Sequence, residues 1–211
     1  LNMWQSDMEI VPEAVLKRRA ACERWKRANR EYYLKQKRDL ANRSEYKAHR
    51  RERYKQKTDE LKELGILPSY YAAHPYFWGD WHRLSFGDSR ASFISPLKAT
   101  IDRDIPYTVH NDSPIVPPDI MRLVSISVNR LTRSGYVLGP EQRASVKEAL
   151  YAVTKGAAFQ YFEEDEKGSI AVGKRADFVV LEKNPLKVDP LKLADLTVME
   201  TFSRGKSIYK K

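Results

Sequence analysis

The sequence is poor in cysteine, since Cys22 is the one thiol among its 211 residues. A single cysteine excludes an internal disulfide framework and a Cys-x-x-Cys metal knuckle. No apolar run approaches the roughly 20 residues that a membrane helix needs, so no membrane partner is expected. The first residues, LNMWQSDMEIVPEA, lack the basic start and apolar stretch of a signal peptide. A reducing, cytoplasmic setting is therefore predicted.

Positive charge is abundant but unevenly distributed. The net charge is +10, yet the segment from Lys17 to Lys57 alone holds 17 Lys or Arg against 5 Asp or Glu. The remainder of the chain is therefore slightly acidic. This difference in composition indicates two regions of different character.

The basic region has the composition of a helix. Residues 12–64 contain no glycine and one proline, and they are rich in residues that favour helices. We expect one or two long helices, with a break at 42–44 and Ser44 as a cap. Seventeen cations interleaved with tyrosines and Trp25 are compatible with sequence-nonspecific binding of nucleic acid through 17–57. The alternative is a solvated helical face, which is the usual role of a charge run.

From Gly65 onward, strands are expected to alternate with helices. Residues 65–71 predict a short buried strand after a glycine C-cap, and 105–109 predict a second strand. The segment HPYFWGDWH at 74–82 is expected to be a loop, and three helices are expected at 96–104, 119–131 and 145–161. Ser145 and Glu148 have the spacing of a capping box. The alternation predicts βα units of a parallel sheet or barrel, and thus an α/β fold class.

The last fifty residues indicate an antiparallel β unit. Short strands are expected between the glycines of 168–173 and at 176–181, and a hairpin is expected across 198–209 around Arg204-Gly205-Lys206. Asp177 is expected to support a turn of this unit rather than catalysis.

Three segments resemble the amidohydrolase superfamily, and within it amidohydrolase family 3. They are GSIAVGKRADFVVLEKNPL at 168–186, IPYTVHNDSPIVPPD at 105–119 and SYYAAHPYFWGDWH at 69–82. The resemblance, over about 59–211, implies the C-terminal part of a (β/α)₈ barrel at 59–162, with strands 7 and 8. It further implies part of a small β-sandwich at 163–211, preceded by a basic, mostly helical extension at 1–58.

The resemblance implies a metal-dependent hydrolase that cleaves C–N bonds of small, amide-like substrates with a metal-activated water. It implies a divalent metal, with zinc favoured, and it makes Asp112 both a metal ligand and the group that handles the proton of the water. A carboxylate suits both tasks, and barrel enzymes place their chemistry at the carboxyl ends of strands. From the residues alone, Asn111-Asp112-Ser113-Pro114 is also good turn chemistry.

Other candidate site residues surround these two segments. His110 lies two positions before Asp112, so both side chains point the same way if the strand continues. A substrate contact and a packed histidine are both open for His110. A substrate-pocket loop and a loop packed down by its own aromatic residues are equally open for the set His74, Trp78, Asp80 and His82.

The sequence departs from the resemblance in its histidines. There are four, at positions 49, 74, 82 and 110, and no two form His-x-His. His49 is expected to be a solvated helix residue, and Asp112 alone does not make a metal site. Two strands cannot close a barrel, which indicates a truncated enzyme, one piece of an assembly or an inactive remnant. A homo-oligomer is left open, and so is an interaction protein that acts through 17–57.

Overall fold

A computed structural model describes residues 17, 20, 24, 27 and 44–211, with side chains from 52 onward in the last range. The chain divides into two units, residues 1–56 and 57–211. Helix α3 (Ser44–Glu63) begins at the serine that the sequence predicts as a cap. Of the rest of the predicted helical segment, residues 17, 20, 24 and 27 are helical, and the other positions from 12 to 43 lie outside the described residues. In the part that the structure describes, no helix is long and apolar enough to cross a membrane.

Helix α3 ends in the predicted glycine cap. The Gly65 N–H donates to the Lys62 carbonyl at 3.1 Å, and the Ile66 N–H donates to the Leu61 carbonyl at 2.8 Å. These two bonds form a Schellman motif, which needs a left-handed residue at Gly65, where φ is 64°. The chain then turns directly into the first strand.

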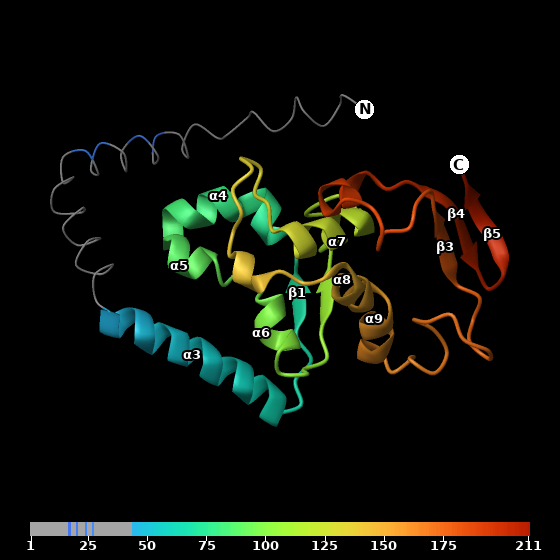
Figure 1. Ribbon diagram of the computed structural model, residues 1–211, viewed down its shortest axis with the longest axis horizontal. Coiled ribbons are helices and arrows are strands. Elements are labelled where there is room, and N and C mark those ends of the chain that lie inside the picture. The colour runs from blue at the N-terminus through green and yellow to red at the C-terminus, as the bar shows by residue number, and fades with distance from the viewer. Residues whose placement is uncertain (1–16, 18–19, 21–23, 25–26, 28–43) are drawn as a thin grey trace. The chain divides into compact units, whose positions relative to one another are not determined.

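The second unit is built around two short parallel strands. β1 (Ser69–Tyr71) pairs with β2 (Thr108–His110), with Tyr71 opposite His110. Figure 1 shows the two strands side by side among the helices. The helices between and after them are α4 (His74–Phe86), α5 (Asp88–Ala91), α6 (Leu97–Ile101), α7 (Ile120–Asn129), α8 (Val146–Val153) and α9 (Lys155–Gln160), with a 3₁₀ turn η1 (Pro140–Gln142). The α/β class and the parallel pairing are confirmed.

The elements predicted at 74–82 and 145–161 differ from those of the structure. Residues 74–82 form the first part of α4 rather than a loop, because Pro75 suits a first helical turn and Gly79 packs against Thr132. A Cβ at Gly79 would lie 2.7 Å from Thr132 Cγ2, so this glycine serves close packing instead of a turn. The helix predicted at 145–161 is divided at Thr154, where φ is −126° and ψ is −88°.

The core of this unit lies where the helices cover β1 and β2. Its buried members include Leu97, Val109, Leu123, Val124 and Ala149. Ser145 Oγ accepts from the Glu148 N–H, and the Glu148 carboxylate accepts from the Ser145 N–H, which confirms the predicted capping box. Asp119 caps α7 in the same manner, by accepting from the Arg122 N–H at 2.9 Å.

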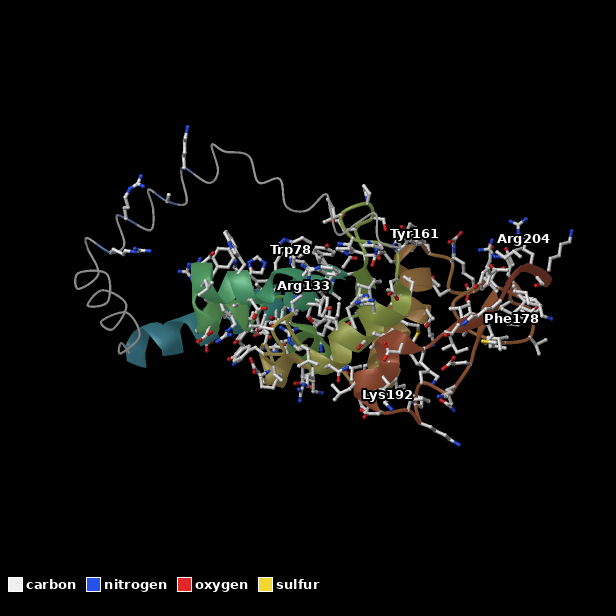
Figure 2. The ribbon with its side chains drawn as sticks, turned by 90° about the horizontal axis from the view of Figure 1, so that it is seen from above. Trp78, Arg133, Tyr161, Phe178, Lys192 and Arg204 are labelled. Atoms are coloured by element: carbon white, nitrogen blue, oxygen red, sulfur yellow. The ribbon has the colours of Figure 1, made fainter. Side chains whose placement is uncertain are left out.

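The C-terminal residues form one antiparallel sheet in the order β3 (Phe178–Leu181), β4 (Val198–Ser203) and β5 (Lys206–Lys210), with the 3₁₀ turn η2 (Pro190–Asp195) before β4. Figure 2 labels Phe178 and Arg204 on this sheet. Asp177 Oδ1 accepts from the Arg204 N–H at 2.7 Å, so it supports the hairpin as predicted. The strand predicted at 168–173 was wrong: Ile170 and Val172 are fully exposed there and pair with no strand.

Candidate functional site

The candidate site lies at the carboxyl ends of β1 and β2. Because the two strands are parallel, the polypeptide leaves both of them at the same end of the sheet. This end is called the carboxyl edge of the sheet. Tyr71 and His110 are the last residues of the two strands and lie opposite each other. Asp112 follows His110 by two residues. This edge therefore holds the residues on which the sequence predictions concentrate.

Four aromatic rings meet at this edge. The Tyr71 ring stacks on the His110 ring, with centroids 5.7 Å apart and an interplanar angle of 17°. His74, at the start of α4, presents its ring edge-on to Tyr71 at 4.5 Å. Trp78 (labelled in Figure 2) lies one helical turn later, 5.9 Å from His74 and 5.8 Å from Tyr71. The structure thus brings together His74, Trp78 and His110, and adds Tyr71; these four residues are called the ring cluster below.

The orientation of His110 is fixed from the neighbouring strand. Ser69 Oγ lies 2.9 Å from His110 Nδ1, within hydrogen-bonding distance. Together with the stack on Tyr71, this contact holds the imidazole in one plane. The other ring nitrogen, Nε2, then has a set direction.

Asp112 occupies an exposed turn directly after β2. Its φ of 54° is left-handed, a region that Asp and Asn tolerate better than most residues. The Asn111 side chain braces the turn by donating to the carbonyls of Val116 and Pro117 at 3.1 and 2.7 Å. The Asp112 charge reaches the ring cluster, since it opposes the lowering of the His74 pKa. Asp112 therefore presents an exposed carboxylate on a turn whose backbone is held by Asn111.

Burial dominates the electrostatics of the two histidines on α4. It lowers the pKa of His74, with a further lowering from His82 and His110. Burial also lowers the pKa of His82, whose ring stacks on Phe86 at 5.2 Å. Both ring nitrogens of His82 are buried and have no hydrogen-bond partner among the described residues. Both imidazoles are therefore biased toward the neutral form.

The structure gives Asp80 hydrogen bonds outside the ring cluster. Its carboxylate accepts from Thr132 Oγ1 at 2.8 Å and from Ser134 Oγ at 2.6 Å, and from the Ser134 N–H at 3.1 Å. Burial raises the pKa of Asp80, but these bonds more than offset it and leave the pKa below its usual value. Its bonds join α4 to residues 132–134, which is a structural task.

Sequence reasoning missed Tyr71. Its hydroxyl oxygen is buried and has no hydrogen-bond partner in the part of the chain that the structure describes. Burial, and then the Asp112 charge, raise the pKa of Tyr71. The available signal was its place as the last residue of a predicted strand, in a motif already singled out. The unpartnered hydroxyl itself is a property of tertiary packing.

The donor set for a metal is incomplete among the described residues. No group of three or more His, Cys, Asp or Glu side chains is close enough there to hold an ion. Asp112 supplies one carboxylate, whereas a zinc site needs three or four protein donors. The His49 side chain lies outside the described residues, and its predicted solvated position stays a prediction.

Comparison with known proteins identifies relatives. The sequence model of the amidohydrolase family, family 3, matches residues 4–209. The chain is 26% identical over 146 residues to an N-substituted formamide deformylase from Arthrobacter pascens. The aligned region covers 69% of this chain and 27% of that protein. This chain thus spans about a quarter of that relative's length.

Two solved structures of metal-dependent hydrolases are also similar to this chain. An uncharacterized metal-dependent hydrolase from Pyrococcus furiosus is similar with a TM-score of 0.53 and 31% identity, covering 63% of this chain and 26% of that one. Its counterpart from Pyrococcus horikoshii OT3 gives a TM-score of 0.55 and 25% identity, covering 64% of this chain and 28% of that one. The family match starts well upstream of residue 59, where the resemblance in the sequence was expected to begin. Nucleic-acid binding through 17–57 is untested by these similarities and stays a prediction.

Proposed function

Because this chain belongs to the amidohydrolase family, we propose that it is part of a metal-dependent hydrolase acting on C–N bonds of small, amide-like substrates. The family membership and the metal-dependent hydrolases among its structural relatives support a hydrolase that uses a divalent metal. The name of the Arthrobacter relative supports an N-substituted formamide or similar amide as the substrate class.

Asp112 is the residue proposed to bind the metal and to act as a general base. The observation that carries this role is its position directly after β2, on the edge where the ring cluster lies. A bound metal ion would supply an activated water as the nucleophile. The carboxylate of Asp112 would take up the proton of that water, because a hard oxygen ligand can also serve as a base.

Zinc is the proposed metal, and its remaining ligands would come from polypeptide outside the described residues. His74, Trp78 and His110 would form one wall of the substrate pocket, with His82 behind them. Asp80 is retained as a pocket candidate that acts by holding α4 against residues 132–134.

We further propose that residues 59–162 are part of a (β/α)₈ barrel and 163–211 part of a small β-sandwich, after a basic extension at 1–58. The parallel strands separated by helices support the first assignment, and the antiparallel sheet supports the second.

The proposal is tested by amine release from N-phenylformamide, an N-substituted formamide, by the full chain with Zn²⁺ or with a chelator. We expect release that depends on the metal. Asp112→Asn should lower the rate about 100-fold or more, as the loss of a general base does. Asp104→Asn is the matched control, because Asp104 is also exposed with a left-handed φ of 53° but lies before β2. Release that ignores both the chelator and the Asp112 substitution would refute the proposed function.

A further inference from the structure

The hydroxyl of Tyr71 differs from the hydroxyls of two other tyrosines of this unit, Tyr70 and Tyr107. Tyr70 Oη lies 2.6 Å from Thr100 Oγ1, and Tyr107 Oη donates to the Glu148 carbonyl at 2.9 Å. Tyr71 Oη is buried and bonds to none of the described residues. Buried polar groups are nearly always hydrogen-bonded, so the Tyr71 hydroxyl, like the two ring nitrogens of His82, is an exception that requires a reason.

Packing fixes the position of this hydroxyl. The Tyr71 ring stacks on His110, meets His74 in a T-shaped contact and lies in a tilted contact with Trp78. Its backbone carbonyl accepts from Ser95 Oγ at 3.0 Å, which ties the end of β1 in place. A phenol is a neutral donor at physiological pH. Tyr71 is therefore a fixed donor with no acceptor among the described residues, and it feels the charge of Asp112.

From this geometry we propose that the Tyr71 hydroxyl donates a hydrogen bond to the carbonyl oxygen of the substrate. The inference rests on the proposed function for the substrate class, since an amide supplies the acceptor. The surrounding rings then contact the flat carbonyl group and its N-substituent. Tyr71 is thus a substrate-binding residue that selects carbonyl compounds over analogues of the same shape that lack the oxygen.

The ligand must displace a neighbour to reach this oxygen, because Tyr71 Oη is shielded from solvent in the free protein. His74 packs edge-on against the Tyr71 ring and belongs to the first turn of α4. That turn has no side-chain cap bond, so a shift of His74 breaks none. The new bond to the carbonyl compensates for the displaced ring contact.

The test compares the binding of two probes by isothermal titration calorimetry on the full chain. N-phenylformamide carries the carbonyl, and N-methylaniline replaces the formyl group with a methyl group. Wild type should bind the formamide roughly tenfold more tightly, the scale of one hydrogen bond to a buried donor. Tyr71→Phe should abolish this preference, and Tyr70→Phe should keep it because Tyr70 already has Thr100 as its partner.

A second measurement guards against a folding defect in the Tyr71→Phe variant. The ¹³C=O stretch of bound, labelled N-phenylformamide should shift to lower frequency in the wild type, as a hydrogen-bonded carbonyl does. A preference that survives in Tyr71→Phe, equal or no binding of the two probes by the wild type, or an unshifted carbonyl band each overturns the inference. Zinc content of the same preparations separates the two proposals: a metal-free chain that keeps the probe preference refutes only the metal-dependent function.

Discussion

The parallel-stranded region and the C-terminal antiparallel sheet are held together by different forces. Around β1 and β2, side chains such as Leu97, Leu123 and Val124 are buried almost completely. Among the described residues of β3, β4 and β5, none is buried, and Val179, Ile208 and Tyr209 are about half exposed or more. The first region has a hydrophobic core of its own, whereas the sheet relies on local contacts and on Leu181 of β3, which packs against that core.

Those local contacts can be named. The hairpin between β4 and β5 turns through Arg204 and Gly205, both with positive φ, as a tight two-residue turn requires. Phe178 and Phe202 stack across β3 and β4 with centroids 4.5 Å apart. An exposed three-stranded sheet gains little from the hydrophobic effect. The same kind of substitution should therefore change the free energy of unfolding by different amounts in the two regions.

The largest difference is expected for a leucine-sized side chain. Leu123→Ala removes a side chain that is 1% exposed and should lower the free energy of unfolding by about 2–5 kcal/mol, through lost burial and a cavity. Ile208→Ala, at a position 66% exposed, should cost under about 0.5 kcal/mol. Urea denaturation of both variants measures the gap. Similar losses would mean that the sheet is covered in solution.

A serine pair gives a smaller contrast. Ser145→Ala breaks the capping box at the start of α8 and should cost about 1 kcal/mol. Ser207→Ala on exposed β5 should change the free energy of unfolding by less than about 0.5 kcal/mol. The same urea experiment resolves the two. Equal effects would show that the cap contributes nothing beyond an ordinary surface serine.

The smallest expected effect concerns pH. Burial lowers the pKa of His82 below its ordinary value of 6.5, so the unfolded chain binds the proton more readily than the folded one. Stability should therefore fall as pH drops through 6.5, and His82→Phe should reduce this fall. Tyr209→Phe, in a sheet without histidine, is the control. Urea midpoints at pH 7 and pH 5.5 measure the effect, and an unchanged pH dependence in His82→Phe contradicts it.

Local signals in the sequence predicted much of this fold. The capping box at Ser145, the glycine cap at Gly65 and the hairpin glycine each act within a few residues, so the pattern suffices. Residues 74–82 were misassigned as a loop because the role of Gly79 depends on Thr132, which is 53 positions away in the sequence. The strand predicted at 168–173 has the right composition but no partner to pair with.

The candidate site was predictable only in part. His74, Trp78 and His110 were singled out by residue type and spacing, and the structure brings their rings together. Asp80 was singled out equally, but its carboxylate is occupied by Thr132 and Ser134. Tyr71 was missed because an unsatisfied hydroxyl arises from three-dimensional packing.

Metal analysis is the direct test of whether this chain contributes Asp112 to a divalent metal site. The full chain is purified after expression with added zinc, dialysed and measured by inductively coupled plasma mass spectrometry beside Asp112→Asn and Asp104→Asn. We expect bound zinc in wild type and Asp104→Asn, and a clear loss in Asp112→Asn. A wild type that retains no zinc, manganese or iron, or an Asp112→Asn variant that retains as much metal as the wild type, contradicts this expectation.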